Sequence, residues 1–252
     1  MKRIIGIVLS VALCASLCGC MISHRGFTYK NAKKYSVGDA SVSEKVTGIE
    51  VGWGNGDVTF VYGDGTAITA SETSDKELSD EMRLHYWLDG ETLRLQFCAS
   101  GQKQWNDVSK QLTVTLPRGT ELDEVKVATV SGGVSAEAFA VKTLEAVTVS
   151  GQVRLALTEA EKVKIATTSG AVDLSLNGNA KDADIATVSG AVKLILPPET
   201  GFTVTPVSVS GKFTCGFSTE ITNGKHTAGD GALKLTLASV SGDLSIQPAE
   251  TE

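Results

Sequence analysis

Three charged side chains at equivalent positions of a repeated sequence are the residues best placed to do chemistry together. Arg154, Asp173 and Lys193 each stand four residues after the serine of a Ser-Gly pair. A carboxylate between cations on one outer face of a parallel β-helix can act on a polysaccharide by acid–base catalysis. Charges that alternate in sign along a stack of strands also keep the strands in register without any substrate. Because this simpler interpretation explains all three residues, we predict that the protein is not an enzyme and assign no catalytic residue.

The other reactive side chains do not form a recognisable site in the sequence. His24, His85 and His226 are far apart in the chain, so the local sequence suggests no histidine-centred triad. Gly63-Asp64-Gly65 and Gly229-Asp230-Gly231 lack the Gly-Gly-x-Gly-x-Asp repeat that builds calcium sites in β-helices, and we interpret them as turns. We therefore predict no metal site and no cofactor.

A Ser-Gly-x-Val motif returns through the second half of the chain at a nearly constant interval. The successive intervals are 19, 19, 20, 21 and 31 residues, between Ser131, Ser150, Ser169, Ser189, Ser210 and Ser241. Phe213 and Leu244 replace the valine in the last two copies. Repetition at such a period is typical of a solenoid, in which each unit buries its apolar face only against its neighbours.

Apolar residues alternate on both sides of each motif serine, as expected for a strand, a tight turn and a second strand. Around Ser169 the inward positions are Val163, Ile165, Val172 and Leu174. The glycine is expected to supply backbone freedom at the turn, and a Thr or Ser two residues before each motif serine to bond along the stack. We predict an all-β fold, a right-handed parallel β-solenoid of about six to seven two-strand coils of 19–21 residues.

Residues 46–120 are predicted to be an N-terminal β module that caps the solenoid of residues 121–248. Residues 49–62 repeat the inward spacing with Asn55-Gly56 at the turn. Because an uncapped stack exposes unpaired strand groups, we expect this module to close the first edge. Further elements are expected at residues 82–88, 92–97 and 111–116 as strands, at Asp89-Gly90 as a hairpin turn and at 74–80 as one helical turn.

The last motif interval is longer than the others and indicates an insertion of about 11 residues. Asn223-Gly224 and Asp230-Gly231 mark turns within it. We expect a hairpin or loop that lies beside the last coil.

The first twenty residues have the features of a secretory signal peptide. Lys2-Arg3 precede an apolar stretch, Ile4–Ala15, that is too short to span a membrane. Leu17-x-Gly19-Cys20 resembles the lipobox of bacterial lipoproteins, whose cysteine becomes the lipidated first residue of the mature chain. We predict Cys20 as a lipid anchor, residues 21–45 as a tether, and an extracytoplasmic protein held at the membrane. An ordinary cleaved signal without a role for Cys20 is the alternative.

Charge and cysteine content narrow the classes of partner. The formal net charge is −6, and removal of Lys2 and Arg3 makes it more negative by two, so we exclude nucleic acid as a partner. Beyond Cys20 the mature chain contains Cys98 and Cys215. An exported protein can join them in a disulfide, while the inward position of Cys215 favours a small buried side chain; both alternatives stay open.

One column of small apolar residues is not explained by packing inside a coil. It stands three residues before each motif serine, on the predicted outer face, and consists of Ala128, Val147, Ala166, Ala186, Val207 and Ala238. We call these six residues the strip. Residues 46–120 or another chain cover the strip, or it is a binding surface. It is our candidate partner face.

Several motifs together resemble one known family. They are the strand pair Ile-x-Val-x-x-x-Asn-Gly-Asp-Val-Thr at residues 49–59, Leu-Thr-Val-Thr-Leu-Pro at 112–117, and the serial Thr-Val-Ser-Gly-x-Val coils. In this order, after a signal peptide, they resemble the bacterial putative adhesin family, a domain of unknown function found in β-solenoid proteins of the cell envelope. The resemblance implies that fold for residues 46–247 and implies no catalytic residue.

Three functional interpretations remain open from the sequence. The first is a lipid-anchored surface protein, an adhesin or binding scaffold that presents a flat β face to an envelope protein or a glycan. The second is an accessory protein in envelope stress signalling that binds a membrane regulator on the strip. The third is a polysaccharide-acting enzyme. The sequence does not determine the oligomeric state.

Overall fold

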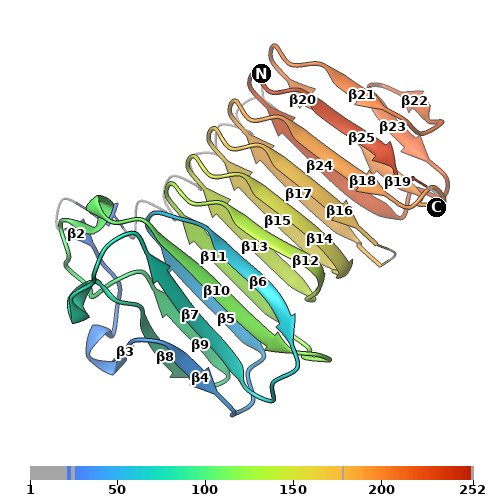
Figure 1. Cartoon of the computed structure of the whole chain (residues 1–252). Helices are drawn as coiled ribbons and strands as arrows, with labels where there is room; N and C mark the ends of the chain where they lie inside the picture. The colour runs from blue at the N-terminus through green and yellow to red at the C-terminus, as the bar shows by residue number, and fades with distance from the viewer. Residues whose placement is uncertain (1–21, 24–25, 178, 251–252) are drawn as a thin grey trace.

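The structure, a computed structural model, describes residues 22–23, 26–177 and 179–250. Two long β-sheets face each other across one core (Figure 1). One sheet carries the strip, and we call it the strip sheet. Its strand order is β22-β23-β19-β24-β17-β15-β13-β11-β5-β9-β8-β3, with β20 beside β24. The opposite sheet has the order β21-β25-β18-β16-β14-β12-β6-β10-β7-β4. The predicted all-β fold with parallel stacked strands is confirmed.

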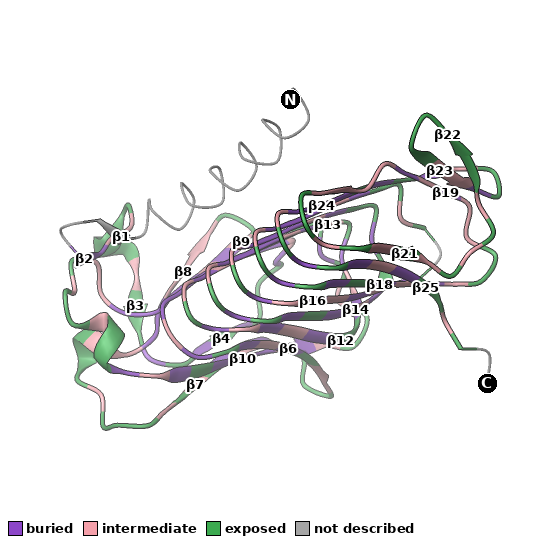
Figure 2. Cartoon of the chain, turned by 90° about the horizontal axis from the view of Figure 1, so that it is seen from above, coloured by how far each residue is buried: buried purple, intermediate pink, exposed green. Residues whose placement is uncertain are grey.

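Each repeat contributes one strand to each sheet, and equivalent residues of neighbouring coils lie side by side. Val127, Ala146, Ile165 and Ile185 are consecutive neighbours in parallel strands, and all four are buried. Figure 2 shows the buried residues running along the strands of the whole stack. The coil strands of the strip sheet are β11 (Glu124–Thr129), β13 (Thr143–Thr148), β15 (Lys162–Thr167), β17 (Asp182–Thr187), β24 (Leu233–Ser239), β19 (Phe202–Val204) and β20 (Val207–Ser208). Those of the opposite sheet are β12 (Val134–Ala140), β14 (Val153–Glu159), β16 (Val172–Leu176), β18 (Val192–Leu196), β25 (Leu244–Pro248) and β21 (Phe213–Cys215).

The last two coils do not stack in the order of the sequence. Strand β24 pairs with β17 on one side and with β19 on the other, and β25 pairs with β18 and β21. The coil of residues 233–248 therefore lies between the coils of residues 182–196 and 202–215. The inserted segment forms the expected hairpin, β22 (Glu220–Thr222) and β23 (Lys225–Ala228), but it pairs with β19 of the outermost coil and not with the last coil in sequence.

The motif glycines are needed for close backbone approach and not for an unusual backbone angle. A Cβ atom added to Gly170 would lie 1.8 Å from the carbonyl oxygen of Gly151, and one on Gly190 would lie 1.9 Å from that of Gly170. Neither residue has a positive φ. The expectation that glycine supplies backbone freedom here was wrong. Glycine is needed because the backbones of successive coils lie too close together at the corner to admit a side chain.

Two sets of hydroxyls bond the corners of the coils. The Thr148 Oγ1 accepts the backbone N–H of Gly151 at 2.9 Å and donates to the Gly132 carbonyl at 3.2 Å. The Ser169 Oγ donates to the Val149 carbonyl of the preceding coil at 3.3 Å. Hydroxyl bonding along the stack is thus present, while the threonine also closes its own turn as a short side-chain cap.

The N-terminal residues continue both sheets. Strand β5 (Gly48–Trp53) pairs in parallel with β11, and β6 (Val58–Gly63) pairs with β12, so the degenerate copy forms a coil of the stack. The strip sheet then adds β9 (Thr92–Gln96), β8 (His85–Asp89) and β3 (Ser36–Val37). The opposite sheet adds β10 (Lys110–Pro117), β7 (Ile68–Ser74) and β4 (Ala40–Val42). Strands β8 and β9 form the hairpin predicted at Asp89-Gly90.

Short 3-10 turns interrupt the strands of this region. They are η1 (Ala32–Lys34), η2 (Asp80–Met82) and η3 (Trp105–Asp107). The helical turn expected at residues 74–80 comes later, because Ser74 still belongs to β7. The strand expected from residue 82 likewise begins only at His85.

Most of the predicted tether is part of the fold. The Phe27 side chain is fully buried and packs near Phe97 and Trp105. Ala40 and Val42 are buried where β4 pairs with β7. The prediction that residues 21–45 are a tether was wrong from residue 26 onward. Apolar residues that show no period in the sequence can still pack against the end of the stack. Strand β1 (Ile22–Ser23) pairs with β2 (Gly26–Phe27).

The predicted signal peptide and Cys20 lie outside the described residues. Across the part of the chain that the structure describes, no helix has the length and apolar character needed to span a bilayer.

Candidate binding face

The strip forms one straight line on the outer side of the strip sheet. Parallel pairing places Ala128, Val147, Ala166 and Ala186 side by side, followed by Ala238 and then Val207. These residues alternate along their strands with inward core residues, so their side chains point away from the core. The structure therefore brings all the predicted face residues together, and it places Ala238 between Ala186 and Val207 because of the inserted coil.

The middle of the strip is buried although it lies outside the main core. Val147 and Ala166 are 2% exposed, and Ala186 and Ala238 are 3% exposed. Two small apolar clusters contain them, separate from the main core; the partly buried apolar side chain packed against the first cluster is Val149, and against the second it is Val207. Ala128 and Val207, at the two ends, are half-buried. The four middle residues of the strip therefore expose almost no surface, and the two end residues carry most of its exposure.

The strands of residues 46–120 lie beside the strip and not across it, since they extend both sheets sideways. The segment Thr28–Lys30 approaches the strip at its first coil. It lines a pocket of about 290 Å³ together with Glu50, Lys126, Ala128 and Val147. Residues 28–30 thus lie next to the end of the strip that begins with Ala128, which we call its near end.

A charged column borders the strip on the side away from the motif serines. Lys126, Glu145, Lys164 and Asp184 are neighbours in register and alternate in sign. The Lys164 Nζ lies 3.4 Å from the Glu145 Oε1. Burial raises the pKa of Asp184 above its usual range, although the nearby Lys164 acts in the opposite direction. The border largely neutralises itself and leaves the apolar strip as the distinctive feature of this face.

Arg154, Asp173 and Lys193 lie on the other outer face. The Arg154 Nε is 4.0 Å from the Asp173 Oδ2, and the Gln152 Nε2 donates to the same oxygen at 2.7 Å. Asp173 is the register neighbour of both Arg154 and Lys193. These are exposed or half-buried groups on a flat sheet, an arrangement that fits a charge ladder between coils.

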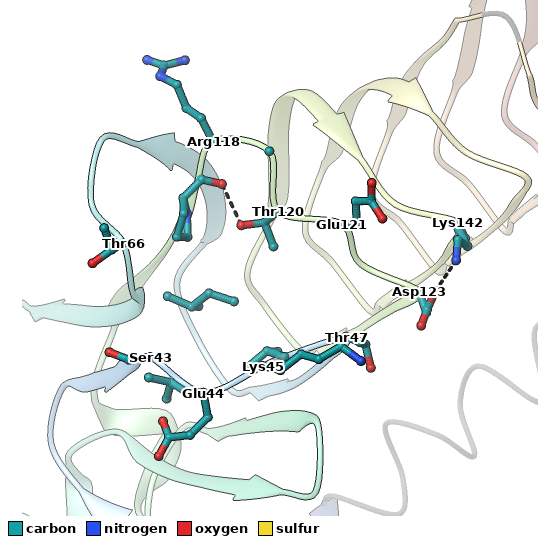
Figure 3. A pocket seen from close by; sticks show the side chains of 15 residues that line it. Ser43, Glu44, Lys45, Thr47, Thr66, Arg118, Thr120, Glu121, Asp123 and Lys142 are labelled. Carbon is teal, nitrogen blue, oxygen red and sulfur yellow. Dashed lines mark hydrogen bonds and ion pairs between the residues drawn. The ribbon is translucent and has the colours of Figure 1, made fainter.

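An open polar pocket of about 510 Å³ lies where the N-terminal strands meet the first repeat (Figure 3). Most of its lining comes from the connections before β5, β7, β11 and β13, so the sequence carried no signal for it. Its cations are paired within the chain: Lys142 with Asp123 at 2.5 Å, Lys45 with Glu91 at 3.1 Å and Arg118 with Asp64 at 3.0 Å. A hydrogen bond from Lys142 holds the pKa of Asp123 below its usual range. The pocket fits a junction between two parts of the fold better than a ligand site.

A buried ion pair in the N-terminal region also escaped the sequence analysis. The Lys110 Nζ lies 2.6 Å from the Glu72 Oε2, and both side chains are almost fully buried. The Nζ also donates to the carbonyl of Met82 at 2.7 Å and to that of Phe97. Its ammonium group lies 5.0 Å from the centre of the Trp53 ring. Because polar atoms surround the ammonium and Glu72 also accepts the Leu84 N–H at 2.7 Å, we interpret the pair as structural.

The two cysteines of the folded region are both free. Cys98 follows β9 in the N-terminal region, while Cys215 lies in β21 of the outermost coil, so the disulfide alternative is excluded. Burial raises the pKa of Cys98 to about 12, which keeps its thiol protonated and unreactive. Within residues 22–23, 26–177 and 179–250, no group of three or more His, Cys, Asp or Glu side chains is placed to hold a metal.

The fold and the face define the class of protein: a β-solenoid whose candidate site is a flat surface. The chain belongs to the Toastrack DUF4097 family, whose model matches residues 46–187 and 158–247. This confirms the family that the sequence motifs resemble. The comparison with curated proteins yields no match.

Similar solved structures come from several bacteria. A Clostridium sporogenes "putative cell adhesion protein" has a TM-score of 0.52 at 13% identity, covering 86% of this chain and 100% of its own. A Bacteroides fragilis "putative adhesin" has a TM-score of 0.40 at 15% identity, covering 86% and 98%. A Parabacteroides distasonis "putative lipid binding protein" has a TM-score of 0.35 at 17% identity, covering 86% and 97%. At such identity the first likeness shows the fold alone.

Proposed function

We propose that this protein is a non-enzymatic, lipid-anchored β-solenoid of the cell envelope that binds a partner protein on the strip. The observation that carries the proposal is the strip itself, six small apolar side chains in register on an outer sheet face. The name of the Clostridium sporogenes relative, which shares the fold, points to the same class of function. On the other face Asp173 is in contact with Arg154 and Gln152 of the neighbouring coil, which supports a charge ladder over a polysaccharide-acting site.

The chemistry of the strip favours a protein over a glycan as the partner. Sugar rings present hydroxyls that need hydrogen-bond donors and acceptors, and the methyl groups of Ala and Val supply none. An apolar side-chain stripe on a partner protein would instead gain from leaving water on such a surface. The self-paired charges of the bordering column would tolerate partners of either sign.

Lipidation at Cys20 would hold the binding face close to the membrane. Cys20 stands six residues before Gly26, and a chain extends at most about 3.3–3.6 Å per residue. The anchor would therefore lie within roughly 20 Å of β2, next to the near end of the strip. Incorporation of labelled fatty acid tests this part of the proposal. It should be abolished by Cys20→Ser and kept by Cys18→Ser; incorporation that persists in Cys20→Ser would exclude the anchor.

The partner face is tested by placing charge on it. Ala166→Glu with Ala186→Glu introduces two stacked carboxylates into the strip, which an apolar partner could accept only at a large desolvation cost. The double variant should lose the partner in a pull-down from the native envelope. The matched control, Ala156→Glu with Ser175→Glu, puts two stacked carboxylates on the opposite sheet and should keep the partner. An unchanged partner list with the strip variant would refute the face.

A further inference from the structure

The pocket at the near end of the strip lies on the same row of outward residues as the strip itself. Parallel pairing places Gly52 beside Ala128, and Gln96 beside Gly52 on its other side. Along β5 and β9 these residues alternate with core residues, so they face outward as the strip does. Because Gly52 has no side chain, it leaves room in the row between Gln96 and Ala128. All three residues line the pocket of about 290 Å³ that Thr28–Lys30 bound on one side.

Gln96 brings an unpartnered polar atom to this pocket. The residue is only 5% exposed, and a hydrogen bond joins its side chain to Tyr35. The carbonyl end of the amide, Oε1, is buried and has no hydrogen-bond partner among the described residues. A buried acceptor without a donor is unfavourable. A ligand that donates one hydrogen bond to the Gln96 Oε1 would remove this penalty.

The rest of the lining favours a neutral ligand with an apolar body. Three charged residues line the pocket, and each forms an ion pair within the chain: Glu50 with Arg94, Lys126 with Glu124, and Glu145 with Lys164. A charged ligand would therefore compete with existing pairs at these three positions. Val51, Val127, Ala128 and Val147 add apolar lining.

We propose that the partner protein of the strip places one tryptophan or tyrosine side chain in this pocket and donates its N–H or O–H to the Gln96 Oε1. Both side chains combine a large apolar ring with one polar group that needs a partner when buried. They are also enriched among the residues that dominate the binding energy of protein interfaces. A pocket of about 290 Å³ is at the lower limit for small-molecule sites and suits a single side chain. The inference rests on the strip being a binding face, as in the proposed function, and adds the residue that anchors the partner.

Indole and N-methylindole test the pocket without a partner protein. The two molecules have similar rings, but only indole has an N–H to donate. Each is titrated into the isotope-labelled full chain, and its dissociation constant is measured from changes in amide chemical shifts. Both should shift the amide signals of Gly52 and Gln96. Indole should bind at least about fivefold more tightly, as expected for one hydrogen bond to a buried acceptor.

Substitution of Gln96 tests the acceptor. Gln96→Leu should bind indole and N-methylindole with equal affinity, and in the pull-down from the native envelope it should recover less of the partner. The matched control is Gln247→Leu, which changes an exposed glutamine of β25 and should keep both the preference for indole and the partner. Melting temperatures of the two variants, which should agree within a few degrees, exclude loss of the fold as the cause.

Three results would overturn the proposal: no shift at Gly52 and Gln96, equal affinities of the unsubstituted chain for the two molecules, or a preference for indole that persists in Gln96→Leu. Full recovery of the partner by Gln96→Leu would also overturn it, because the partner would then not use this acceptor. The charged strip variants test the proposed function separately. Loss of the partner in those variants without an indole preference would refute the anchor residue and leave the binding face in place.

Discussion

The central coils and the N-terminal end bury their side chains in two different ways. In the central coils every layer repeats the one before it, so that Leu155, Leu174 and Leu194 are equivalent neighbours in one apolar column. At the N-terminal end the stack finishes with residues that have no counterpart, including Phe27 and the Lys110–Glu72 pair. Each repeated coil covers the apolar face of the next one. The N-terminal end of the stack has no further coil, so non-repeated contacts must cover it.

The difference also separates structure from candidate function. Repetition on the inward side of a strand brings repetition on its outward side, because the two alternate with period 2. The strip therefore follows from the regularity of the coils and extends over the six Ser-Gly coils. The unique contacts of the N-terminal end named above are buried, so their role is in stability.

The largest expected effect of a single substitution lies at the N-terminal end. Glu72→Ala leaves the Lys110 ammonium buried without its carboxylate and should lower the free energy of unfolding by about 3–5 kcal/mol. The double variant Lys110→Met with Glu72→Leu replaces the pair by apolar groups and should recover most of that loss. Urea unfolding monitored by tryptophan fluorescence measures the stability of both variants. A double variant as unstable as Glu72→Ala would mean that the pair itself, and not the unpaired charge, decides stability.

The core of the central coils should respond somewhat less strongly. Leu174→Ala removes a buried side chain between two fixed neighbours and should cost about 2–5 kcal/mol. Asp173→Ala, one residue away on the outer face, should cost under about 1 kcal/mol as a ladder charge. Thermal unfolding of the two variants under the same conditions gives the contrast. Equal losses would contradict the inward and outward assignment in this coil.

Substitution of a motif glycine tests whether the coils need close backbone contact. Gly170→Ala places a methyl group against the Gly151 carbonyl and should cost about 1–3 kcal/mol or more, as overpacking does. Gly65→Ala is the matched control, because its Cβ would meet nothing nearer than 4.0 Å. Chemical unfolding compares the two. If Gly170→Ala were as stable as Gly65→Ala, the motif glycine would not be explained by stacking.

The smallest effect concerns the charged border of the strip and depends on pH. The pKa of Asp184 is raised from 3.8, mainly by burial, so the native carboxyl holds its proton to higher pH than the unfolded one. Its contribution to stability is full below pH 3.8 and is lost as pH rises through the raised value. Asp184→Asn should therefore stabilise the protein at pH 7 by under about 1 kcal/mol and lose this advantage near pH 3. Melting temperatures of the protein and the variant between pH 3 and pH 7 test this prediction. A difference in melting temperature that is the same at all pH values would exclude the titration of Asp184 as the cause of the stabilisation.

Much of the fold could be predicted because the same pattern of residues occurs in several coils. The serines, glycines and alternating apolar residues recur together, so strands, corners and faces follow from one coil and apply to the others. The tether prediction over residues 21–45 failed from Gly26 onward because Phe27, Ala40 and Val42 show no period, and burial of a single side chain depends on partners far away in the chain. The Lys110–Glu72 pair was missed for the same reason: a lysine and a glutamate 38 residues apart carry no local sign that they meet.

The sequence by itself determined the period of the coils, their inward and outward faces and the composition of the strip, because side chains alternate across a strand whatever lies beyond it. Only the tertiary structure decided which coils are neighbours at the C-terminal end. The coils of residues 202–215 and 233–248 present similar inward faces, so the motif alone does not distinguish their positions. The β22–β23 hairpin between them pairs with the outermost strand, and the final coil fills the place next to β17. That order is a property of the connections in space, and it is what makes the strip continuous from Ala128 to Val207.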